Sequence, residues 1–241
     1  MRKLLKWELK NTLLSTRVFV ISLVSLAMFA LVVGVGIYQH GGSYELFVNG
    51  LYGSTDTMML IGAIFAGMSI SGAYADRYAQ AAVLAGSGRS KFVTSKCLSY
   101  VVAMAIFFFI PLVLTSVAGL IIQGPQALPV GIMHDIIVPT IMVYIVILGM
   151  NSIFIASSFL VKSLGAAIGI NVALYMATSV GTNIIAIVKP STTAWMPWTQ
   201  DAMIQAEQTM DIYLKAIAII AVTIVVFVSI AFAKFSKTEL K

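Results

Sequence analysis

The stretch CLSYVVAMAIFFFIPLVLTSVAGLII (residues 97–122) decides the fold class of this chain. It contains no Lys, Arg, Asp or Glu, and it exceeds the roughly 20 residues that a helix needs to cross a bilayer. The chain has 241 residues, of which 60% are hydrophobic and only 10% are charged. A soluble domain carries about 25% charged residues, so the composition predicts a polytopic membrane protein.

Five further stretches are long and apolar enough to span a membrane. We therefore expect an all-α integral membrane protein, with one transmembrane domain over residues 1–241 and six transmembrane helices. A charge at the centre of a span costs roughly 2.5–3.5 kcal/mol, and the interiors of these stretches carry none. Pro111 and Pro139 fall inside two of the stretches and predict kinks there. The expected spans are 18–38, 57–75, 97–122, 135–161, 164–188 and 212–233.

The first apolar run follows a basic start and has to be distinguished from a signal peptide. It is longer than a typical signal-peptide core, and Gly34-Val35-Gly36 is a poor cleavage site. We expect it to remain in place as the first span.

The positive charges alternate from one connection to the next. They are frequent before the first span, between the second and third spans, and in the tail, whereas residues 39–56 and 123–134 carry no Lys or Arg. Because cytoplasmic loops of membrane proteins are enriched in Lys and Arg, the pattern predicts a multi-pass protein with both termini in the cytoplasm. The same rule accounts for the net charge of +6 without nucleic acid as a partner.

Two segments outside the spans contain more than a simple connection. Residues 1–17, MRKLLKWELKNTLLSTR, place their cations on one helical face and leucines on another, which predicts an amphipathic helix on membrane lipids. The alternative is a charged leader that only orients the first span. Residues 189–211 contain Trp195 and Trp198, which favour the bilayer interface, and predict short extracellular helices, re-entrant or interfacial. A solvated loop is the alternative there.

No catalytic or cofactor-binding motif is present, so we expect a protein that is not itself an enzyme. His40 and His134 have no ligand neighbours at metal-site spacing, and Cys97, the only cysteine, is expected to be a packing residue. Residues 86–90, GSGRS, lack the arrangement of a phosphate-binding loop. Polar residues within the spans either line a weak substrate pathway or join helices to one another. The pathway candidates are Asn151, Asn171 and Thr178.

The connection between the second and third spans is the most distinctive part of the chain. Residues 76–85 favour a short, flat helix because of their alanines, and Gly86 and Gly88 end it. Such a helix, framed by cations, suits a groove on another protein.

In layout the whole chain resembles the type-2 ABC transporter permease family. AVLAGSGRSKFVTSK (residues 82–96) is similar to the turn that follows the cytoplasmic coupling helix in that family. Where a Glu commonly precedes that helix, Asp76 is the nearest acid here. The resemblance implies that segment 76–92 contacts a cytoplasmic ATPase. The expected contact residues are Asp76, Arg77, Arg89, Ser90 and Lys91.

The resemblance also implies the partners and the function. The chain would pair with a second permease subunit, as a homodimer or with a sister permease, in a bacterial plasma membrane. Separate ATPase subunits would bind ATP and Mg²⁺, and the cargo would be a hydrophobic or amphipathic peptide such as a bacteriocin, a lantibiotic or a cytolytic peptide. The alternatives are a structural or sensory subunit that transports nothing, export of a lipid or a drug, and, least favoured, a membrane enzyme acting on lipid.

Overall fold

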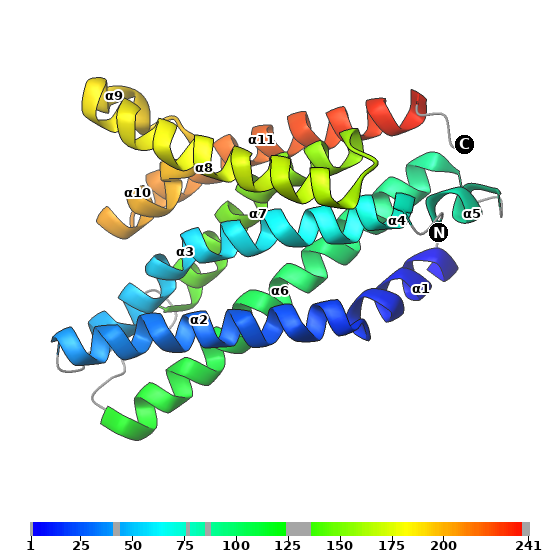
Figure 1. The fold of residues 1–241 in the computed structure, drawn as a ribbon. Helices are drawn as coiled ribbons and strands as arrows, with labels where there is room; N and C mark the ends of the chain where they lie inside the picture. The colour runs from blue at the N-terminus through cyan, green and yellow to red at the C-terminus, as the bar shows by residue number, and fades with distance from the viewer. Residues whose placement is uncertain (1, 41–43, 76–77, 85–87, 124–135, 238–241) are drawn as a thin grey trace.

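The computed structural model describes residues 2–40, 44–75, 78–84, 88–123 and 136–237. Every regular element in these ranges is helical (Figure 1). Asp76, Arg77, Gly86 and His134, which the sequence singled out, lie outside the described residues.

Within the described ranges, six long stretches of helix run back and forth along one axis (Figure 1). Both ends of the chain, α1 and the short α5 lie at one end of this bundle, and α9 and α10 lie at the other. The long stretches are α2 (Thr16–His40), α3 (Tyr44–Ala66) continued by η1 (Gly67–Ser71) and α4 (Gly72–Ala75), α6 (Arg89–Gln123), α7 (Val138–Leu160), α8 (Leu164–Val188) and α11 (Met210–Lys237). The short helices are α1 (Arg2–Leu13), α5 (Tyr78–Leu84), α9 (Pro190–Thr193), η4 (Pro197–Thr199) and α10 (Gln200–Ala206).

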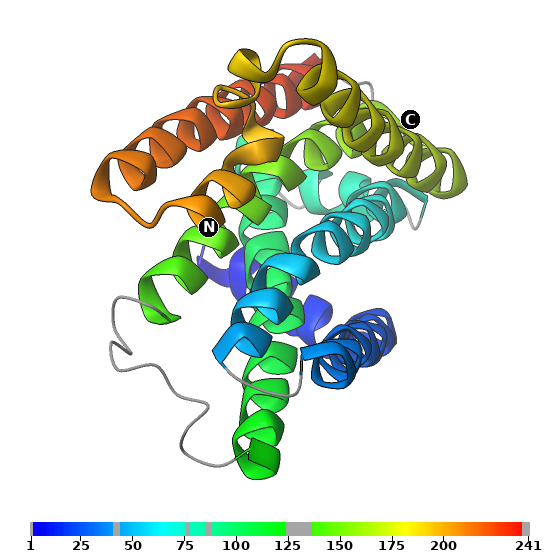
Figure 2. The same cartoon turned by 90° about the vertical axis from the view of Figure 1, so that its left-hand side faces the viewer.

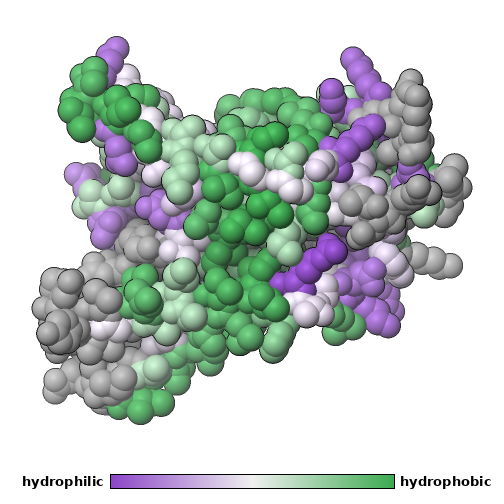
Figure 3. All heavy atoms as spheres, viewed as in Figure 1, coloured by the Kyte–Doolittle hydropathy of each residue, from purple (hydrophilic) through white to green (hydrophobic). Residues whose placement is uncertain are grey.

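Five of the described helices are long and apolar enough to cross a membrane. A sixth span is possible if α1 and α2 are counted together, although they meet at an angle of 53°. Hydrophobic side chains cover the middle of the face in Figure 3, and hydrophilic ones gather toward its two ends. The expected all-helical membrane protein is thereby confirmed in outline.

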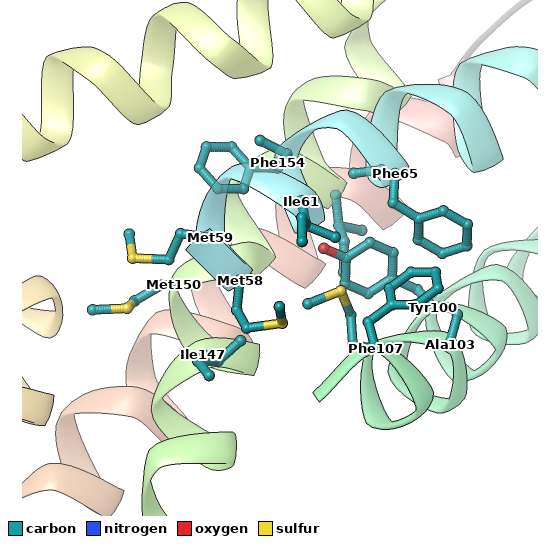
Figure 4. Packing of buried hydrophobic residues seen from close by; sticks show 14 of the residues in the cluster. Met58, Met59, Ile61, Phe65, Tyr100, Ala103, Phe107, Ile147, Met150 and Phe154 are labelled. Carbon is teal, nitrogen blue, oxygen red and sulfur yellow. The ribbon is translucent and has the colours of Figure 1, made fainter. Parts of the chain in front are cut away.

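The bundle is organised around α7, most of whose side chains are buried. It packs against α3, α8 and α11. Figure 2 shows α8 and α11 on one side of the bundle and α2 and α6 on the other. Large apolar side chains from three helices pack together in the centre (Figure 4). They include Met58, Met59, Ile61 and Phe65 from α3, Tyr100, Ala103 and Phe107 from α6, and Ile147, Met150 and Phe154 from α7.

Several helix boundaries differ from the sequence-based expectation. The third span was expected to begin at residue 97, but α6 begins at Arg89. The first two turns of α6 are polar, and a search for apolar residues alone does not include them. Pro139 was expected to kink the fourth span, yet it lies in the first turn of α7, where a missing amide hydrogen costs nothing. Arg17 was assigned to the N-terminal amphipathic helix, but it lies in the first turn of α2.

A π-helical segment, η1, interrupts the second span. It lies against α8, and a Cβ atom on Gly67 would come within 2.8 Å of an Ile168 side-chain carbon. The Ser71 hydroxyl reaches the end of α7, where it lies 2.9 Å from the Ser158 carbonyl oxygen and 3.0 Å from that of Val161. Contacts to two other helices therefore hold the extra residue of the wide turn in place.

Candidate functional site

The short helix α5, between the second and third spans, is held to the bundle through Tyr78. The Tyr78 ring stacks on Trp7 of α1, with ring centroids 4.7 Å apart. The Tyr78 ring also contacts Phe92 of α6, with ring centroids 5.8 Å apart. The Lys96 ammonium lies 5.2 Å from the Tyr78 ring centroid, within range of a cation–π interaction. One residue of α5 thus contacts both the N-terminal helix and the third span.

Beside Tyr78, a buried ion pair joins α1 to α6. The Lys96 Nζ atom lies 2.9 Å from Glu8 Oε1, and the two side chains are only 8% and 2% exposed. Burial and the negative charge of Glu8 raise the pKa of the Tyr78 hydroxyl, which stays protonated. Sequence reasoning missed this pair. Its signal was a single acidic residue, Glu8, on an otherwise basic helix.

From Tyr78, ring contacts continue into the bundle. We call Tyr74, Tyr78, Phe92, Phe159 and Phe235 the aromatic cluster. Its rings come from α4, α5, α6, α7 and α11. Phe235 is central: its ring centroid lies 5.2 Å from that of Phe92, 5.7 Å from that of Phe159 and 6.0 Å from that of Tyr74. The aromatic cluster therefore connects α5 to three of the long helices.

Three of the expected ATPase-contact residues lie at the start of α6, directly after α5. Ser90 and Lys91 are exposed. Arg89 is partly buried, and its guanidinium donates a hydrogen bond to the Ser236 carbonyl oxygen near the end of α11. Arg89 therefore has a structural contact in addition to any role at the surface.

Of the expected pathway residues, Asn171 is fully buried in a network between three helices. Its amide nitrogen donates to the Ala63 carbonyl oxygen at 2.8 Å and to the Ser158 hydroxyl at 2.9 Å. Its carbonyl oxygen accepts a hydrogen bond from Ser157. These bonds join α8 to α3 and α7, which is the helix-joining role that the sequence left open.

Asn151 of α7 is also fully buried, and it lies beside Gly62 of α3. A Cβ atom on Gly62 would lie 2.0 Å from Asn151 Oδ1 and 2.7 Å from the Tyr100 hydroxyl oxygen. Tyr100 donates a hydrogen bond of 3.0 Å to the Gly62 carbonyl oxygen. Because glycine has no side chain, the Asn151 amide and the Tyr100 hydroxyl can both lie against Gly62. Among the described residues, Thr178 donates to the Leu174 and Tyr175 carbonyl oxygens of its own helix, each at 2.9 Å.

The opposite end of the bundle carries a partly buried acid, Asp201, in the short-helix segment. Burial is the main cause that raises the pKa of Asp201 in α10 to about 6, and the charge of nearby Asp56 adds to it. Trp195 is 68% exposed, and the Lys215 ammonium lies 4.2 Å from its ring centroid. No feature of the sequence predicts that Asp201 would be partly buried near a second acid, Asp56.

No group of three or more His, Cys, Asp or Glu side chains that could hold a metal ion occurs within the described residues. The α5 end carries the stacked rings of Trp7 and Tyr78 and the buried ion pair between Glu8 and Lys96. No protein-family model matches this chain, and no curated protein matches it.

Proposed function

We propose that this chain is the membrane-spanning permease subunit of an ABC exporter, which uses ATP hydrolysed by a separate cytoplasmic subunit. The observation that carries the proposal is the anchoring of α5 through Tyr78 to α1 and α6. A helix that receives force from a partner has to be joined firmly to the spans, and α5 is joined to them.

The aromatic cluster supplies a physical route for that force. Stacked and edge-on rings pack at interior density, so a displacement of Tyr78 has to move Phe92 or deform its contact. Phe92 contacts Phe235, and Phe235 contacts Phe159. A motion of α5 would thereby reach α6, α7 and α11 together.

The surface beside α5 is suited to a protein partner. Ser90 and Lys91 are exposed. Lys162, in the connection between α7 and α8, adds a further exposed cation. We propose that this end faces the cytoplasm and that the ATPase docks here, with Asp76 and Arg77 completing the contact.

The proposed cargo is a hydrophobic or amphipathic molecule, with a peptide as the first class to test and a lipid or a drug as the alternatives. No charged side chain is buried in the middle of the described spans. The polar atoms of Asn171 and Tyr100 form hydrogen bonds with neighbouring helices, to side-chain hydroxyls and backbone carbonyl oxygens. Translocation would therefore need a rearrangement or a second subunit, and we propose a permease dimer.

A second candidate is a structural or sensory subunit that transports nothing. The hydrogen bonds of Asn171 favour this second candidate, because they join α3, α7 and α8 in a fixed arrangement. Such a subunit would need no ATPase partner.

Purification of the tagged chain with its native neighbours distinguishes the two candidates. The exporter predicts that a P-loop ATPase copurifies, and that Lys91→Glu weakens its retention or the stimulation of its activity. Lys189→Glu, which reverses an exposed charge at the opposite end, is the matched control. Copurification without any ATPase, or equal effects of both variants, would support the structural subunit.

A further inference from the structure

The π-helical segment η1 separates α3 from α4 in the second span, near the end of the bundle that carries α5 (Figure 1). A π turn holds about one residue more than an α turn. If η1 became α-helical, α4 would turn by about 100° relative to α3 and move about 1.5 Å along the helix axis. We propose that η1 is a two-state switch of helical register, and that the register decides whether α4 contacts α7 and α11. The inference concerns the chain itself and holds whether or not an ATPase is attached.

The α3 side of the switch is fixed to α8. The Ala63 carbonyl oxygen accepts a hydrogen bond of 2.8 Å from the Asn171 amide nitrogen. At Gly67, the first residue of η1, a Cβ atom would lie 2.8 Å from an Ile168 side-chain carbon and 3.1 Å from the Ile168 backbone nitrogen. The second span and α8 therefore meet backbone to backbone at Gly67, and a change of register in η1 has to turn α4 rather than α3.

On the α4 side, the contacts that depend on the register are made with α7 and α11. The Ser71 hydroxyl donates to two carbonyl oxygens at the end of α7. Three residues further on, the Tyr74 ring centroid lies 6.0 Å from that of Phe235, and the Tyr74 hydroxyl lies 3.5 Å from the Phe159 carbonyl oxygen. Residues three apart share one face of a helix. A rotation of about 100° would therefore take both Ser71 and Tyr74 away from α7 and α11.

The sequence of η1 does not itself require a wide turn. Residues 67–71, GMSIS, contain no proline. The backbone on either side is ordinary α-helix, with φ −58° and ψ −48° at Ala66 and φ −58° and ψ −35° at Gly72. Because π-helix is rare in proteins, a segment without a local reason for it favours the α register. The contacts of Ser71 and Tyr74 with other helices therefore stabilise the π register, and their loss favours the α register.

The α register costs little at the end of α7. One acceptor of Ser71, the Val161 carbonyl oxygen, lies in the connection between α7 and α8, where Lys162 and Ser163 are exposed. Water can replace the Ser71 hydroxyl at such a helix end. The loss of the other bond, to Ser158, changes the ratio of the two registers about two- to tenfold. The two registers are therefore close enough in free energy to exchange.

The test observes the environment of Tyr74 directly. The full chain is made with 3-fluorotyrosine, placed in nanodiscs and studied by fluorine NMR, and the signal that is absent from Tyr74→Phe identifies Tyr74. We expect two Tyr74 resonances, a major one for the ring packed on Phe235 and a minor one for the turned helix. Ser71→Ala should raise the minor resonance relative to the major one about two- to tenfold, because it removes a hydrogen bond made only in the π register.

A second variant removes the extra residue of the turn. Deletion of the partly exposed Ser69 lets an α turn place Ser71 and Tyr74 where the π turn places them. This variant should keep its unfolding midpoint and show only the major resonance, with or without Ser71→Ala. Deletion of Ile145, a partly buried residue of the regular helix α7, is the control and should lower the midpoint, because it turns half of α7 away from its neighbours.

A matched serine variant controls for the loss of a hydroxyl group within a span. Ser116→Ala removes a hydroxyl that bonds only the Leu112 carbonyl oxygen of its own helix, at 2.6 Å, among the described residues, and it should leave both Tyr74 resonances unchanged. A single Tyr74 resonance that Ser71→Ala neither splits nor moves would show a rigid turn and overturn the proposal. Equal effects of Ser71→Ala and Ser116→Ala, or equal losses of stability in the two deletion variants, would also overturn it.

Discussion

Ser25 of α2 donates a hydrogen bond of 2.5 Å to the backbone carbonyl oxygen of Phe107 in α6. That carbonyl is the acceptor that Pro111, four residues later and without an amide hydrogen, leaves without its helical partner. Because Ser25 is fully buried and no water is present inside a span, a side chain from another helix has to satisfy this carbonyl. The Ser25 hydrogen bond therefore satisfies the Phe107 carbonyl oxygen and also joins α6 to α2.

Ser25→Ala should lower the free energy of unfolding by about 0.5–2 kcal/mol, because the Phe107 carbonyl loses its partner. In a Pro111→Ala background the amide returns, and the same substitution should cost much less. Unfolding in mixed micelles by a denaturing detergent measures all four proteins of this cycle. If Ser25→Ala lowered the free energy of unfolding equally with Pro111 and with Pro111→Ala, the role of Ser25 as the substitute donor for the Phe107 carbonyl would be contradicted.

Glu8→Ala should destabilise the protein by about 3–5 kcal/mol, since it leaves the buried Lys96 ammonium without its counterion. Combining it with Lys96→Met should recover most of the loss. Lys6→Ala, an exposed change on the same helix, is the control. Thermal unfolding of the purified chain checks the result, and a double variant no better than Glu8→Ala would argue against the ion pair.

Gly62→Ala should cost about 1–3 kcal/mol, because the new methyl group would collide with Asn151 Oδ1 and the Tyr100 hydroxyl. Gly169→Ala places a methyl group in open space on α8 and should be neutral or slightly stabilising, as expected for alanine in a helix. Comparing the two unfolding midpoints tests the close approach of α3 to α7. Similar midpoints would show that the two helices are further apart.

Asp201 should make the protein less stable as the pH rises from about 4 to 6. Its pKa is about 6 in the folded protein against an ordinary value of 3.8, so in this range the folded chain holds a proton that the unfolded chain has lost. The stabilisation is complete below pH 4 and is lost as the pH passes 6, and it amounts to at most about 3 kcal/mol. Asp201→Asn should abolish this part of the pH dependence. Unfolding midpoints of both proteins between these pH values check it.

Hydropathy predicts long apolar helices well because span length is set by bilayer thickness, and α8 (Leu164–Val188) matches the expected 164–188. It does not predict η1, since the π turn depends on Gly67 meeting Ile168 on another helix. Hydropathy also places the start of the third span at residue 97 rather than at Arg89. The polar side chains of Arg89 and Lys96 are bound by Ser236 and Glu8, and hydropathy does not include such contacts.

The candidate site was predictable only in part. The sequence identified the segment that contains α5, because alanines and glycines mark a short helix locally. It could not identify Tyr78 as the anchor, since Trp7, Phe92 and Lys96 are distant in sequence. Asn171 was recognised as a polar residue inside a span, but its partners on α3 and α7 require the packing.

The exporter proposal requires α5 to lie on the cytoplasmic side of the membrane, next to the ATPase. In a Cys97→Ser background, Ala81→Cys places a thiol on the exposed side of α5, and Ser191→Cys places one on α9 at the opposite end. We expect that only Ser191→Cys reacts with an impermeant maleimide added outside cells, and that Ala81→Cys crosslinks to a copurifying P-loop ATPase. Labelling of Ala81→Cys from outside would contradict it.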